Sequence, residues 1–208
     1  MILIYRISEL QRWKMEQDPC FLDVDYLVAR GSELERLLQE GLMSKDKATD
    51  QPLLRPEPAV DQKLQEPKTN KTIHLVTRTF ALSALTYLHT VISGPYPNDP
   101  KIKESVERTI ECLQHLPDPK LIRNLGWPFC ITACLATGSS NDTIPNEVDG
   151  GIGSFFAELI KKENVGELSG NVAKWWEVAT ECWRLRGQGQ DVDWVDAMTS
   201  LGFQVLLV

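Results

Sequence analysis

The stretch LIRNLGWPFCITACLA, residues 121–136, places apolar and small side chains around a Trp127-Pro128 step. Asp118, followed by a proline, precedes it as a helix N-cap, and Gly138 follows it as a stop signal. Because a proline inside a helix removes one backbone donor, we expect either a kink or two abutting helices that meet at Trp127. The stretch predicts a buried central helix that serves packing and partner contacts rather than catalysis.

Apolar residues recur at three- and four-residue steps through most of the remaining chain, which is typical of amphipathic helices. Segment 72–92 is apolar on most of its circumference, but His74, Arg78 and His89 interrupt it, so we expect it at the centre of a helical bundle rather than in a membrane. The pattern predicts an all-α fold, a single bundle-like domain of about seven to eight helices. Four of the other expected helices are 1–16, 99–116, 155–160 and 171–187. A further helix starts at Asp23 or Asp25 and runs to Leu42, and the last is capped by Asp191 or Asp193 and runs to Leu201.

The helical pattern is interrupted once over a long distance. Segment 44–71 holds four prolines among charged and amide side chains and has no apolar periodicity, so it is expected to be a disordered linker or long loop. This divides the chain into N-terminal helices (1–43), the linker (44–71) and a main helical domain (72–208). A shorter loop is expected at 137–153, and a short, buried, extended tail at 203–208. The first helix begins at the first residue without a cap, which favours either a truncated gene product or a sequence that continues upstream.

Charge and cysteine usage restrict the partners. The 208 residues include 22 Lys and Arg against 29 Asp and Glu, a formal net charge of −7, so direct DNA binding by this chain alone is not expected. No apolar run approaches the length of a membrane span, so no membrane partner is expected either. The five cysteines are odd in number and dispersed, which favours reduced core thiols in an intracellular protein over a disulfide framework.

Few side chains are arranged for chemistry. Cys130 and Cys134 lie one helical turn apart, but no second cysteine or histidine pair stands near them in sequence, so the prediction is core thiols and no metal. The histidines are isolated, and neither a nucleophile motif nor a phosphate-binding glycine loop is present, so no catalytic residue and no cofactor are predicted. Tyr87, His89, Trp127, Cys130 and Cys134 are the candidate residues for an effector pocket.

Short segments that occur in order along nearly the whole chain carry a family resemblance. They are ISELQRWK (7–14), ELERLL (33–38), FALSALTYLH (80–89), LGWPF (125–129), WRLR (183–186), and Asp193-Trp194 together with 202–208. In combination they resemble the fungal-specific transcription factor domain. That family's domain is the all-helical regulatory region C-terminal to a binuclear zinc cluster in many fungal activators. The resemblance implies a transcriptional regulator in the nucleus, with the cytoplasm before activation as an alternative. It also implies effector response, dimer contacts or masking of activation, through protein partners, a homodimer or a small apolar effector.

One departure from this family limits what is carried over. The six closely spaced cysteines and basic residues of its zinc cluster are absent, so zinc and DNA binding are assigned to no residue of this chain. A cluster-less or truncated member of the family is therefore expected. The alternative is a cofactor-free helical enzyme or carrier that binds a small hydrophobic metabolite between helices, with Tyr87, His89 and Trp127 near the pocket.

Overall fold

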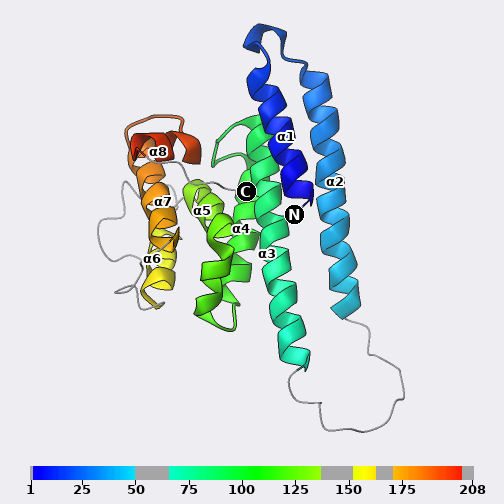
Figure 1. Ribbon diagram of the computed structural model, residues 1–208, viewed down its shortest axis with the longest axis vertical. Coiled ribbons are helices and arrows are strands. Elements are labelled where there is room, and N and C mark those ends of the chain that lie inside the picture. The colour runs from blue at the N-terminus through cyan, green and yellow to red at the C-terminus, as the bar shows by residue number, and fades with distance from the viewer. Residues whose placement is uncertain (1, 50–65, 137–151, 163–170, 203–208) are drawn as a thin grey trace.

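A computed structural model of the chain describes residues 2–49, 66–136, 152–162 and 171–202. Within these ranges the chain is helical and forms no strand, which confirms the prediction of an all-α fold with seven to eight helices (Figure 1). The α-helices are α1 (Ile2–Glu16), α2 (Val24–Thr49), α3 (Glu66–Ser93), α4 (Pro100–Gln114), α5 (Gly126–Leu135), α6 (Ile152–Lys162), α7 (Asn171–Gly187) and α8 (Trp194–Ser200). Two 3-10 helices, η1 (Pro19–Phe21) and η2 (Pro119–Leu125), precede α2 and α5.

Helix α3 is the axis of the bundle, and it contacts α1, α2, α4 and α5 (Figure 1). Every residue from 82 to 91 is buried, as expected of a helix that is apolar on most of its circumference. By length and composition alone, Asn70–Ser93 could cross a membrane, because it contains an 18-residue window with a mean hydropathy of 1.2. However, 61% of this window is buried inside the fold, as is typical of the central helix of a bundle.

The central stretch folds as two abutting helices, one of the two expected arrangements. The 3-10 helix η2 ends at Leu125 and α5 starts at Gly126, so the junction lies just before Trp127. Pro128 falls in the first turn of α5, where a backbone N–H has no intrahelical partner, and the proline therefore interrupts no helical hydrogen bond. Burial of every residue from 128 to 136 confirms that this helix lies in the core.

Close packing between α5 and α7 fixes the position of that junction. A Cβ atom on Gly126 would lie 2.5 Å from Nε1 of Trp175, so only glycine lets the two helices approach this closely. At the other end of α5, the indole N–H of Trp183 donates to the carbonyl of Ala133 at 2.9 Å. Arg186, one turn further along α7, donates to a carbonyl of the same last turn of α5. Side chains of α7 thus donate hydrogen bonds to carbonyls in the last turn of α5.

Aspartate caps set the starts of several helices, as the sequence predicted. The carboxylate of Asp99 accepts hydrogen bonds from the first turn of α4, and that of Asp118 accepts one from the start of η2. Of the alternatives left open, Asp23 caps α2, with its Oδ1 atom 2.9 Å from the N–H of Tyr26. Asp193 caps α8 in a capping box.

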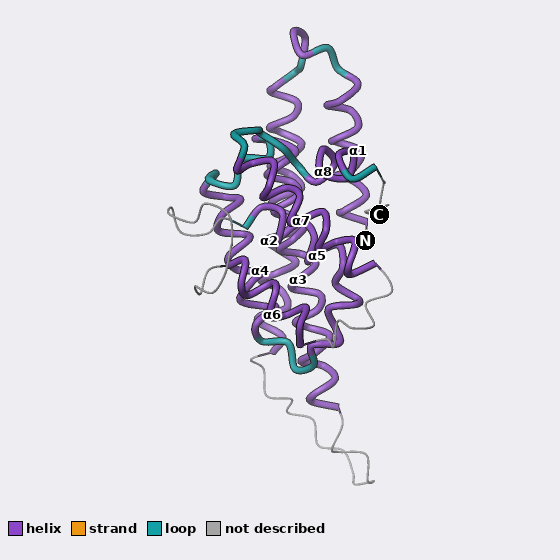
Figure 2. The backbone as a smooth tube through the Cα atoms, turned by 90° about the vertical axis from the view of Figure 1, so that its left-hand side faces the viewer, coloured by secondary structure: helices purple, strands orange, loops and turns teal. Residues whose placement is uncertain are grey.

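The N-terminal helices form a hairpin that packs along α3 (Figures 1 and 2). Helices α2 and α3 both continue into the segment expected to be a linker, since α2 reaches Thr49 and α3 starts at Glu66. Helix propensity in these charged segments carries the helices beyond their apolar periodicity. The remainder of the expected linker lies outside the described residues, as do most of the expected loop at 137–153 and the expected tail at 203–208.

Candidate functional site

Tyr87 and Trp127, two of the candidate pocket residues, lie together where α3, α5 and α8 meet. The Tyr87 ring stands edge-on to the rings of Trp127 and Trp194, with centroids 6.1 and 5.7 Å away. Trp127 also stacks on Phe80, with centroids 6.2 Å apart and planes inclined by 10°. The hydroxyl of Tyr87 donates a hydrogen bond to Gln11 of α1, and burial raises the pKa of this phenol, which keeps it a donor. Neighbouring rings therefore occupy the space around both side chains.

His89 lies on a different face of α3, because two helical positions rotate a side chain by about 200° relative to Tyr87. Its Nε2 atom is 3.3 Å from Oε1 of Glu35 in α2, and Nζ of Lys101 in α4 donates to both oxygens of the same carboxylate at 3.1 and 3.0 Å. Burial acts to raise the pKa of Glu35, but hydrogen bonds and charge from Lys101 and His89 outweigh it, so this pKa lies below its usual value. The three side chains join α2, α3 and α4.

Cys130 and Cys134 are both fully buried in α5, with their sulfur atoms 3.9 Å apart. Burial and the adjacent Cys130 thiol raise the pKa of Cys134 well above its usual value. Cys182 of α7 is hydrogen-bonded to the Cys134 thiol. This hydrogen bond and burial raise the pKa of Cys182 as well. Because the thiolate is the form that attacks electrophiles and binds metals, these thiols are set for packing. Within the part of the chain that the structure describes, no group of three or more His, Cys, Asp or Glu side chains is arranged to hold a metal ion.

The structure therefore separates the five candidate residues into three places. Tyr87 and Trp127 share an aromatic cluster, Cys130 and Cys134 share a thiol pair in the core, and His89 belongs to an interhelical polar group. The separation of His89 from Tyr87 follows from helical periodicity and was readable from the sequence. Whether any of the five contacts an effector stays a prediction.

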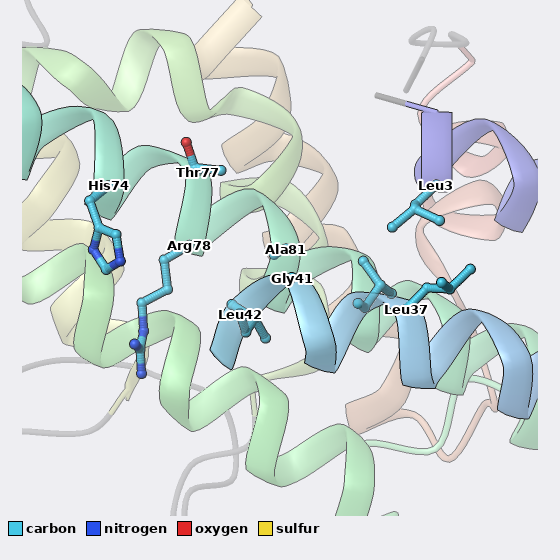
Figure 3. A pocket seen from close by; sticks show the side chains of 9 residues that line it. Leu3, Leu37, Gly41, Leu42, His74, Thr77, Arg78 and Ala81 are labelled. Atoms are coloured by element: carbon cyan, nitrogen blue, oxygen red, sulfur yellow. The ribbon is translucent and has the colours of Figure 1, made fainter. Parts of the chain in front are cut away.

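A partly open cavity of about 120 Å³ lies elsewhere, between α1, α2 and α3 (Figure 3). Its lining is mainly aliphatic, and His74, Thr77 and Arg78 of α3 add the polar groups. The aliphatic part of the lining comes from Leu3, Leu37, Leu38, Leu42 and Ala81, with Gly41 beside them. The volume corresponds to about four water molecules at roughly 30 Å³ each. It is well below the roughly 300–1,000 Å³ of pockets that enclose drug-sized ligands.

None of the cavity-lining residues was a candidate for the effector pocket. Periodicity placed Leu3, Leu37, Leu38 and Leu42 on apolar helix faces. It could not show that the apolar faces of α1, α2 and α3 leave a cavity between them. The interruption of the apolar 72–92 segment by His74 and Arg78 was the available signal, because a polar side chain on an otherwise apolar helix is the informative exception.

Comparisons with known proteins agree with the resemblance seen in the sequence. The family described as "Fungal specific transcription factor domain" matches residues 1–208. A trichothecene biosynthesis transcription regulator of Fusarium sporotrichioides is 31% identical over 209 residues, which cover 100% of this chain and 42% of the relative. Its namesake in Trichoderma arundinaceum is 34% identical over 143 residues, covering 68% of this chain and 29% of the relative.

A third relative, the ustiloxin B cluster transcription factor of Aspergillus flavus, is 26% identical over 189 residues, covering 88% of this chain and 29% of the relative. The chain thus spans less than half the length of each of these regulators. No solved structure matches the chain significantly. Since the family match extends over all 208 residues, in an all-helical fold, the chain belongs to the fungal specific transcription factor domain family.

Proposed function

We propose that this chain is the regulatory region of a fungal transcription factor that works in the nucleus, has no enzymatic activity and acts through a protein partner. The observation that carries the proposal is the similarity along the whole chain to proteins named as transcription regulators. The chain's formal charge of −7 supports contact with proteins rather than with the DNA itself.

The interior side chains support a regulatory role over a catalytic one. Burial and neighbouring thiols raise the pKa values of Cys134 in α5 and Cys182 in α7, so these two thiols are poor nucleophiles at neutral pH. The hydroxyl of Tyr87 is engaged with Gln11, and the imidazole of His89 is held against Glu35. Each of these groups joins two helices, which accounts for its presence without a reaction.

The dimensions of the cavity lined by described residues favour a protein partner over an extended apolar effector. The cavity between α1, α2 and α3 has room for a few heavy atoms, whereas an extended hydrophobic metabolite requires several times its volume. The alternative of an enzyme or carrier needs such a pocket, and the aromatic cluster around Tyr87 and Trp127 is filled by its own rings.

A tethering experiment tests the proposal. The 208-residue chain is fused to a bacterial repressor DNA-binding domain in a filamentous fungus, and transcription is measured from reporters that carry the repressor's operator. We expect the fusion to raise or lower transcription severalfold relative to the DNA-binding domain alone. A fusion that is folded, nuclear and bound to the operator, yet changes neither a silent nor an active reporter, would contradict the proposal. Exclusion of the fluorescently tagged full-length protein from the nucleus under inducing conditions would contradict the nuclear assignment.

A further inference from the structure

The connecting end of the α1–α2 hairpin projects beyond the other described elements in both views (Figures 1 and 2). We call residues 15–28 the hairpin tip; it comprises the end of α1, the 3-10 helix η1 and the start of α2. Its apolar side chains are largely exposed to solvent. The exposed fractions are 76% for Met15, 82% for Phe21, 57% for Val24, 47% for Tyr26 and 49% for Val28. Single exposed apolar side chains are ordinary, but five within 14 residues on a projecting end are typical of an interaction surface.

The tip is held rigidly, so this exposure does not come from a frayed end. The rings of Trp13 and Tyr26 pack across the hairpin with centroids 4.6 Å apart. Leu27 is only 3% exposed and belongs to the hydrophobic core. Nζ of Lys14 donates to the carbonyl of Val91 near the end of α3 at 2.6 Å, which fastens the hairpin to the central helix. A partner would therefore meet a preorganised surface and lose little conformational entropy of this chain on binding.

The charge of the tip is entirely negative. Residues 15–28 contain Glu16, Asp18, Asp23 and Asp25 and no Lys or Arg. Asp18 and Asp23 have a local structural role, since each accepts a backbone hydrogen bond at the start of a helix. Glu16 does not, because a carboxylate in the last turn of α1 faces the negative end of the helix dipole. Asp25 lies in the first turn of α2, where the helix dipole favours a carboxylate. Helix stability therefore leaves Glu16 unexplained, and a partner of opposite charge accounts for it.

The same charge excludes other occupants. Two copies of the tip would bring four carboxylates of one chain against four of the other, so a homodimer through this surface is disfavoured. Nucleic acid and anionic membrane surfaces are repelled for the same reason. A basic amphipathic helix matches both the exposed apolar side chains and the negative charge of the tip. Its apolar face would cover the apolar side chains, and its flanking Lys and Arg residues would contact the carboxylates.

We propose that the hairpin tip is the docking surface for a basic amphipathic helix of a partner protein. This inference rests on the proposed function, for which it specifies the partner's chemistry. Phe21 and Val24 supply the apolar contact, and Glu16 and Asp25 supply charge at the rim.

Binding of a defined peptide to the purified 208-residue chain tests this proposal. The probe is an 18-residue helical peptide with leucines at i, i+3, i+4 and i+7 spacing and lysines at its other positions. An otherwise identical peptide with glutamate in place of lysine is the control. Fluorescence anisotropy should show saturable binding of the basic peptide, weakened by salt, and no binding of the acidic one.

Matched variants locate the bound surface. Phe21→Ser/Val24→Ser should weaken binding by about tenfold or more, because truncating well-exposed anchors removes the contact itself. The control Met43→Ser/Ile73→Ser, at sites that are 65% and 58% exposed outside the tip, should change binding less than about twofold. All of these side chains are exposed, so thermal melting should confirm that the variants fold like the unmodified chain.

Neutralised carboxylates test the charge. Glu16→Gln/Asp25→Asn should weaken binding severalfold and reduce its salt dependence. The control Glu104→Gln/Glu107→Gln removes two exposed negative charges from α4, so it changes the net charge as much as the tip variant does. It should weaken binding much less. Equal effects of the tip and control variants, or equal binding of the two peptides, would overturn the proposal.

The tethered reporter separates this inference from the proposed function. If Phe21→Ser/Val24→Ser leaves regulation of the reporter unchanged, the tip is not the docking surface, although the regulatory role stands. If the unmodified fusion regulates no reporter, the proposed function fails independently of the peptide result.

Discussion

Replacing Trp127 with alanine tests whether the aromatic cluster is part of the core or a pocket. Truncating a fully buried Trp destabilises a protein by about 3–5 kcal/mol. Trp127 is half-buried, and it packs on Phe80 and Tyr87 in two aromatic contacts that contribute about 0.5–1.5 kcal/mol each. We therefore expect Trp127→Ala to lower the free energy of unfolding by about 2–3 kcal/mol, a large part of a typical total of roughly 5–15 kcal/mol.

Chemical and thermal unfolding measure this loss. For a chain of this size, each kcal/mol corresponds to about 2–4 °C in Tm, so Trp127→Ala should melt about 5–10 °C below the unmodified chain. Trp127→Phe is the matched control; it keeps a ring in the cluster and should recover most of the difference. A Trp127→Ala chain that melts within a degree or two of the original would refute the core interpretation. If that chain had also lost the thermal stabilisation given by a fungal lipid extract, Trp127 would line an effector site instead.

Three further predictions follow from particular contacts. Gly126→Ala should destabilise the fold by about 1–3 kcal/mol, since its Cβ would lie 2.5 Å from the Trp175 indole. Gly41→Ala, at a helical site with open space, should instead stabilise the fold by about 0.5–1 kcal/mol. Urea unfolding measures both changes. Because the pKa of Glu35 is lowered in the folded state, its contribution is present above its unfolded pKa and is lost as pH falls through the lowered value. Glu35→Gln should therefore reduce stability at neutral pH by about 1 kcal/mol or less and flatten the acid limb of the stability profile, and an unchanged limb would contradict the assignment. Finally, a chelator should leave the melting curve unchanged, and stoichiometric zinc in elemental analysis would contradict the prediction that the buried thiols are core residues that bind no metal.

Local signals in the sequence predicted the helices well. Asp99, Asp118 and Asp193 each precede a helix and each act as its cap, because capping depends on only a few adjacent residues. The sequence also predicted the junction near Trp127, but it left a kinked helix open as an alternative. It could not show the close approach of Trp175 to Gly126, because Trp175 lies 49 residues further along the chain. The end of α2 was placed too early, because the helix continues beyond its apolar periodicity to Thr49.

The candidate pocket was less predictable, because it required side chains from different helices to converge. Tyr87 and Trp127 do meet, but the sequence could not show that Phe80 and Trp194 fill the space around them. His89 was grouped with Tyr87 on residue type, although their spacing of two positions places them on different sides of the helix. Helical spacing separates these two side chains, whereas grouping by residue type does not.

The hairpin tip shows why an interaction surface is difficult to recognise in a sequence. Apolar residues such as Phe21 and Val24 look like core residues until their exposure is known, because composition does not distinguish a side chain that faces the bundle from one that projects beyond it. The structure distinguishes core residues from surface residues, because the base of the hairpin is bound to α3 and α4 while its end is exposed to solvent. Glu35 joins α2 to α3 and α4 at the base, and Lys14 joins α1 to the end of α3. These contacts stabilise the hairpin without using the tip, so the tip can change its partner contacts while the bundle keeps its fold.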